Sequence, residues 1–264
     1  MRRTRRHGLG LLLLTSLGSA CTLPTEKAAS TSPPAPRAAI EVLVGRSRSE
    51  VGDADRHLAT IRTKVLPLAA RLHAAILVNV LGDRSFAGAP PLVTGSYADV
   101  GRDAPGNPYV IAEDEQQVTA ALMPAIDALV HGQVPSPASD VFGGFARVAA
   151  DFAQYPRTTR RVLIVLGDAI DTTAGCVLRE RQLDASHFPG ILDGCTGGRP
   201  LDLTRVEIWM IGAGHAADGT VTDAFARALE PFYRFVAERS GARLVVFGTD
   251  LVAMPVSRRA PADS

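Results

Sequence analysis

The apolar residues of this chain form short continuous runs that alternate with longer stretches of helical spacing. Ile40-Glu41-Val42-Leu43-Val44 predicts a first strand, because it is a short β-branched run that ends at Gly45. Residues 51–72 then repeat apolar side chains every three or four positions, which predicts a helix that packs by one face. Further buried strands are predicted at 74–81, 161–166, 206–211 and 244–247.

Helical patterns separate these strands along the rest of the chain. They cover residues 113–132, 140–152 and 222–240, and two shorter strands are predicted at 92–94 and 109–111. Regular alternation of strand and helix favours an α/β fold. The sequence therefore predicts a doubly wound, mostly parallel sheet with helices on both faces, a Rossmann-like three-layer sandwich.

The first residues have the pattern of an export signal. Basic residues before position 7 precede an apolar stretch at 8–17, and small residues lead to Cys21. About ten apolar residues are too few for a permanent membrane span. Small residues directly before a cysteine resemble the lipobox of bacterial lipoproteins. This resemblance implies a signal peptide at 1–21, cleavage before Cys21, a lipid on its thiol and an extracytoplasmic protein anchored to the cell membrane.

The remaining chain is interpreted as a tether, one domain and a tail. Residues 22–38 are rich in Pro, Ser, Thr and Ala without apolar periodicity, which is typical of a flexible tether. A single α/β domain is predicted at 39–256, followed by a polar tail at 257–264.

Cys176 and Cys195 are the other cysteines of the chain. In an oxidising compartment two such residues predict a disulfide, which would close a loop of about twenty residues. Two buried thiols are the alternative. A metal pair is disfavoured because the CxxC spacing is absent.

Composition excludes some classes of partner. The net charge is +1, from 28 basic and 27 acidic residues, and aromatic residues make up 5% of the chain. No basic stretch with interleaved aromatic residues occurs, so nucleic acid is not an expected partner.

Two loops carry the candidate site. The loop at 45–49 follows the first strand, and the loop at 167–171 follows the strand at 161–166. In open α/β sheets ligands bind beyond the carboxyl ends of the strands, so both loops are expected on one edge.

The order of elements and these loops resemble the von Willebrand factor A-type domain. In that family the first strand ends in Asp-x-Ser-x-Ser, and a Thr and an Asp from later loops complete a divalent-cation site. Here the motif stands as Gly45-Arg46-Ser47-Arg48-Ser49, with Gly45 in place of the aspartate. The later loop positions are best matched by Ser139 and Asp168.

The resemblance implies a magnesium or manganese site formed by Ser47, Ser49, Ser139 and Asp168. Gly45 removes one negative charge from it, and Arg46 and Arg48 add positive ones nearby, so the site is expected to bind a cation weakly or not at all. A metal-free ligand site on the same face is an alternative. A second alternative is that the serines only cap a helix and Asp168 only ends a strand.

His215 follows the strand at 206–211 and is a candidate ligand-binding residue together with Arg46 and Arg48. The expected function is binding of an envelope or extracellular protein through this edge of the sheet. One alternative function is that of a hydrolase that uses Asp168, Asp171 and His215. Another is that of a structural envelope protein whose site has decayed.

Overall fold

The computed structural model describes residues 35–83, 85, 92–132, 135–178, 183–215 and 222–248. The signal peptide, Cys21, most of the tether and the tail lie outside this range, so the predictions made for them, and the predicted end of the domain at 256, stay predictions. No helix in the described ranges is long and apolar enough to cross a membrane.

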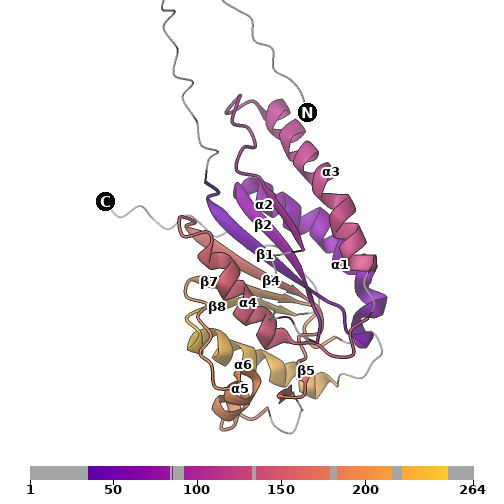
Figure 1. Ribbon diagram of the computed structural model, residues 1–264, viewed down its shortest axis with the longest axis vertical. Helices are drawn as coiled ribbons and strands as arrows, with labels where there is room; N and C mark the ends of the chain where they lie inside the picture. Colours follow the sequence, from indigo (N-terminus) through magenta and orange to yellow (C-terminus); the bar gives the residue numbers. More distant parts are fainter. Residues whose placement is uncertain are drawn as a thin grey trace, which may run out of the picture. The chain divides into compact units, whose positions relative to one another are not determined.

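One six-stranded sheet forms the centre of the described chain, in the order β3-β2-β1-β4-β7-β8 (Figure 1). All neighbouring strands are parallel except β3, which pairs antiparallel with β2. The predicted α/β class with a mostly parallel sheet is confirmed. The strands are β1 (Ala38–Gly45), β2 (Ala74–Leu81), β3 (Val93–Ser96), β4 (Arg160–Leu166), β7 (Val206–Ile211) and β8 (Arg243–Gly248).

Helices cover both faces of this sheet, as the alternation of its side chains requires. On β1, Ile40 and Val42 pack toward one face, while Ala39 and Leu43 pack toward the other. In Figure 1 α1, α2 and α3 cover the first face, and α4, α5 and α6 cover the second. The helical elements are η1 (Arg48–Asp53), α1 (Ala54–Thr60), η2 (Ile61–Val65), α2 (Leu66–Arg71), α3 (Pro108–Gly132), α4 (Val141–Ala153), α5 (Phe188–Thr196) and α6 (Asp223–Arg239).

A small hairpin and α5 extend the second face. Strands β5 (Thr172–Thr173) and β6 (Cys176–Val177) pair antiparallel, and Cys176 forms a disulfide with Cys195 in α5. The disulfide predicted from the two remaining cysteines is therefore present. It fixes α5 to the hairpin that follows the loop after β4.

One predicted element is wrong. Residues 109–111, expected as a short edge strand, belong to the first turn of α3, which begins at Pro108. Proline suits the first position of a helix, and three apolar residues alone do not distinguish a strand from a helix.

Candidate functional site

The carboxyl ends of β1 and β4 lie side by side and define the candidate site. Val44 is the register partner of Leu166, so Gly45 and Gly167 follow at neighbouring positions. The side chain of Glu50, from η1, turns back into the space between these two glycines. The site is therefore centred on a carboxyl group that the motif at 45–49 does not include.

Hydrogen bonds hold both oxygens of Glu50. Oε1 accepts from the backbone N–H of Asp168 at 2.9 Å, which joins η1 to the loop after β4. Oε2 accepts from the backbone N–H and the hydroxyl of Ser47, at 2.9 and 2.8 Å. The Ser47 and Glu50 contacts form a capping box at the start of η1.

The two glycines make room for this carboxyl group. A Cβ atom at Gly45 or at Gly167 would overlap Oε1 of Glu50. Because Glu50 is 3% exposed and held by three donors, it can yield to such an atom only by losing those bonds. The side chain of Glu50 can therefore keep this position only if residue 45 is a glycine.

Burial and a neighbouring carboxylate control the charge of the site. Loss of solvent, and then the nearby charge of Asp168, raise the pKa of Glu50 from 4.5 to about 7, although its hydrogen bonds oppose the shift. Arg46 lies within electrostatic range of Glu50 and is itself 7% exposed, and burial lowers its pKa. The centre of the site is thus a buried, partly protonated acid beside a second acid and a buried arginine.

Several residues predicted for the site meet around Glu50. Ser47 and Asp168 contact it directly, and Asp168 is 4% exposed. Arg46 accepts a hydrogen bond on its carbonyl from the N–H of Ser136, which brings the loop before α4 alongside β1. The sequence predicts a lost negative charge at Gly45, whereas the carboxyl group of Glu50 lies where a side chain at position 45 would begin.

Ser139 lies on the loop before α4 but contacts a different neighbour. Its N–H donates to the hydroxyl of Thr172 at 2.9 Å, and its carbonyl accepts from the N–H of Thr172 at 3.0 Å. The Ser139 hydroxyl is buried and has no hydrogen-bond partner within the described ranges. The helix cap of α4 is Asp140, which accepts from the N–H of Gly143.

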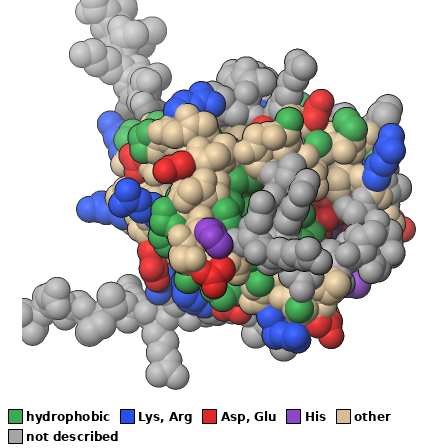
Figure 2. All heavy atoms as spheres, turned by 90° about the horizontal axis from the view of Figure 1, so that it is seen from below, with side chains coloured by type: hydrophobic (Ala, Val, Ile, Leu, Met, Phe, Trp, Pro, Cys, Tyr) green, Lys and Arg blue, Asp and Glu red, His purple; other side chains and the backbone are tan. Residues whose placement is uncertain are grey.

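The remaining predicted ligand residues are more peripheral. Arg48 and His215 are exposed, and the side chain of Ser49 lies outside the described part of the chain. The loop that carries His215 is tied to the site because the N–H of Gly214 donates to the carbonyl of Asp168. Figure 2 shows the molecule from below, with side chains of both charges scattered around apolar ones.

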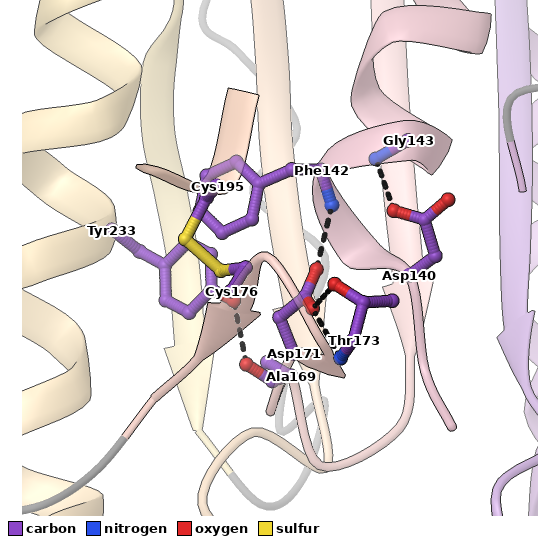
Figure 3. Close-up of a disulfide and its surroundings, with 9 residues drawn as sticks. All are labelled: Asp140, Phe142, Gly143, Ala169, Asp171, Thr173, Cys176, Cys195 and Tyr233. Carbon is purple, nitrogen blue, oxygen red and sulfur yellow. Dashed lines mark hydrogen bonds between the residues drawn. A yellow bond between two sulfur atoms is a disulfide. The ribbon is translucent and has the colours of Figure 1, made fainter. Parts of the chain in front are cut away.

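Asp171, one of the residues that a hydrolase function would use, has a structural role. It is fully buried, and its carboxylate accepts hydrogen bonds from the N–H of Phe142 and from both the N–H and the hydroxyl of Thr173 (Figure 3). Tyr233 supports the same loop by donating to the carbonyl of Ala169 at 2.6 Å. Asp171 thus joins the loop after β4 to α4 and offers no free surface for acid–base chemistry.

Two residues of this region were missed by the sequence argument. Glu50 was detectable, since Ser47-x-x-Glu50 is a capping-box pattern directly after a predicted strand. His57, in α1, is 3% exposed, and neither ring nitrogen has a hydrogen-bond partner within the described ranges. Burial lowers its pKa to about 4, so the ring is neutral near pH 7. Nothing in its local sequence marks His57 as buried.

The residues present do not fit a divalent cation well. The described residues contain no group of three or more His, Cys, Asp or Glu side chains placed to hold a metal ion. Both oxygens of Glu50 already accept hydrogen bonds, and the positive charge of Arg46 is close by. Hard cations prefer several free oxygen ligands and net negative charge.

Comparisons with known proteins do not identify the chain. No family model and no curated protein matches it. One similar solved structure is the pilus adhesin SpaC from Lactobacillus rhamnosus GG in its open conformation, with 12% identity and a TM-score of 0.39. Another is the human COPII-coat protein Sec24c, with 10% identity and a TM-score of 0.36.

Both matches cover most of this chain and a minor part of the other protein. They span 81% and 79% of this chain, but only 28% of the adhesin chain and 33% of the Sec24c chain. Likenesses this distant carry no argument about what the chain binds.

Proposed function

We propose that this chain is an envelope-anchored binding protein whose von Willebrand factor A-like domain captures a protein partner at the carboxyl edge of its sheet. In this proposal Glu50 performs the structural task that a bound cation performs in a metal-containing domain of this type. The partner contacts are made by the exposed residues of the edge loops, among them Arg48 and His215.

The observation that carries the proposal is the set of bonds made by Glu50. One carboxyl group joins the start of η1 to the loop after β4, and that loop is bonded in turn to Gly214. Three loops of the edge are thus fixed relative to one another. Such preorganisation favours binding, because less conformational freedom is lost when a partner docks.

Catalysis is less well supported by the same geometry. The carboxylate of Asp171 is fully buried and used by α4 and β5, while His215 lies exposed after β7. A general acid or base has to reach its substrate within hydrogen-bond distance. The positions of these residues therefore favour binding over hydrolysis.

The cellular location in this proposal rests on the N-terminal sequence and the disulfide. Small residues before Cys21 favour lipidation, and the Cys176–Cys195 bond is typical of proteins outside the cytoplasm. The lipid would hold the domain at a membrane while the edge loops meet the partner.

The test is site-specific photocrosslinking in cells that make the full chain. A photoreactive residue would replace Arg48 or His215 at the edge, and Arg62 or Arg239 as exposed controls on other surfaces. We expect the same adduct from both edge positions and none from the controls. Adducts of equal yield from all four positions, or none from the edge while the protein is present at the envelope, would contradict the proposal.

A further inference from the structure

The amino ends of the parallel strands carry a row of arginines. These strands start together at the edge opposite the candidate site, because they all run in one direction. Each of them has an arginine at its start or within the three residues before it. We call this row the arginine edge: Arg37, Arg71, Arg160, Arg161, Arg205 and Arg243.

Part of this charge is balanced within the fold, and part is not. Glu207 pairs with Arg160 at 2.8 Å and lies 3.5 Å from Arg243. Arg37, Arg71 and Arg205 are exposed, and within the described ranges no carboxylate lies at ion-pair distance from them. Arg71 ends α2, where a positive charge also suits the helix dipole, but Arg37 and Arg205 have no such role.

The surface of this edge is hollowed beside the arginines. One cavity of about 580 Å³ is lined by Arg161, Arg205 and Asp202, and by the residues Thr158, Thr159 and Thr204, whose hydroxyls already bond within the chain. A second, of about 360 Å³, is lined by Arg37, His73 and Arg102, and Arg102 pairs with Asp99 at 3.1 Å. The guanidinium groups of arginines in these cavities are the donors that can bind phosphate oxygens.

The covalent structure brings this edge close to the predicted anchor. Arg37 directly precedes β1 and is sixteen positions after Cys21 in the sequence, so the two residues can be no more than about 55 Å apart. Basic residues held this near an anionic bilayer are attracted to it, and a lipid chain combined with a basic patch is a stable anchoring pair.

We propose that the arginine edge docks on the anionic phospholipid surface of the membrane that carries the anchor, with headgroup phosphates seated in the two arginine-lined cavities. The candidate site then faces away from the bilayer, because it lies at the other end of the same parallel strands. This inference rests on the membrane anchor of the proposed function, but not on which partner the edge loops bind.

The test uses vesicle flotation of the predicted mature chain, residues 21–264, carrying Cys21→Ser, which removes the thiol that would be lipidated. Vesicles of phosphatidylcholine alone are compared with vesicles that also contain phosphatidylglycerol, at low and at high salt. The edge variant is Arg37→Gln, Arg71→Gln and Arg205→Gln combined. The control variant is Arg62→Gln, Arg227→Gln and Arg234→Gln combined, which removes the same charge from other exposed positions.

We expect binding only to the anionic vesicles, loss at high salt, and binding by the edge variant that is roughly fivefold weaker for each arginine removed. The control variant should bind nearly as the parent does, because residues 21–34 are the same in all three proteins. Equal weakening by the two variants, or equal binding to neutral vesicles, would overturn the proposal. Circular dichroism of both variants verifies that they are folded.

Discussion

Glu50 and Gly45 depend on each other at the end of β1. A Cβ atom at position 45 would overlap Oε1 of Glu50, so Gly45→Ala has to displace a carboxyl group that accepts three hydrogen bonds. We expect a loss of about 1 to 3 kcal/mol in the free energy of unfolding, measured by urea denaturation.

A double-mutant cycle separates this contact from a general effect of alanine. In a Glu50→Ala background the overlap is absent, so Gly45→Ala should cost much less there. Gly82→Ala, at the end of β2, is the matched control, because its Cβ would meet its nearest neighbour at an ordinary 3.7 Å. Equal costs for Gly45→Ala in both backgrounds would show that Glu50 does not occupy this space.

The raised pKa of Glu50 predicts a specific pH dependence of stability. Between its usual pKa of 4.5 and its folded value of about 7, the folded chain binds more protons at Glu50 than the unfolded chain does. The stability that Glu50 contributes is therefore complete below pH 4.5 and is lost as the pH rises through about 7.

Glu50→Gln isolates this effect. The free energy of unfolding of the wild type, relative to this variant, should fall by about 3 kcal/mol across that pH range. Burial, followed by the charge of Asp151, also raises the pKa of Glu41 to about 8, but Glu41 is present in both proteins and cancels in the difference. Glu238→Gln, on an exposed position of α6, controls for the loss of a carboxyl group. A pH-independent difference between wild type and Glu50→Gln would refute the assignment.

At the scale of elements, the disulfide fixes a helix to the loop that supports the site. Cys176 follows the loop held by Asp171, and Cys195 lies in α5, which packs against α6 through Phe188 and Phe232. Closing a loop of about twenty residues is worth about 3 kcal/mol in the chain-entropy model.

We therefore expect Cys176→Ser combined with Cys195→Ser to lower the free energy of unfolding by about 3 kcal/mol. Reduction of the wild type with dithiothreitol should give the same loss, and reduction of the double variant should have no effect. A wild type whose stability is unchanged by complete reduction of the bond would contradict this role.

Elements with a strong pattern were predictable from the sequence, and those set by tertiary packing were not. The run from Arg161 to Leu166 is apolar and rich in β-branched residues, which is typical of a buried strand. Residues 109–111 form a similar short apolar run, but they belong to α3, which begins at Pro108. Glu41 interrupts a strand that is otherwise apolar, and its partner Asn79, at 2.7 Å, is distant in sequence.

At the scale of the whole molecule, alternating strands and helices sufficed for the class of fold and for the prediction that the loops at 45–49 and 167–171 share one edge of the sheet. The same pattern did not indicate that Glu50 provides the central carboxyl group of the candidate site, because Glu50 and Asp168 are 118 positions apart in the sequence. When the sequence is compared with the family motif position by position, Gly45 stands opposite an aspartate, and a negative charge is missing. The fold instead brings an equivalent carboxyl group to that point from a different residue.

At the same scale the two proposals assign one function to each end of the sheet. The arginine edge and the carboxyl edge are separated by the length of β1, about 26 Å for its eight residues. A domain docked by one end leaves the other available to a partner.

The central claim is that Glu50, rather than a divalent cation, holds the carboxyl edge of the sheet. The most direct measurement is calorimetric titration of magnesium and of manganese into the wild type and into Gly45→Asp combined with Glu50→Ala. The account predicts no binding heat with the wild type, and binding with the double variant, in which a carboxylate at position 45 faces Asp168 without Glu50 between them. Tight binding by the wild type that is abolished by Asp168→Asn would contradict the claim and make a metal ion the centre of the site.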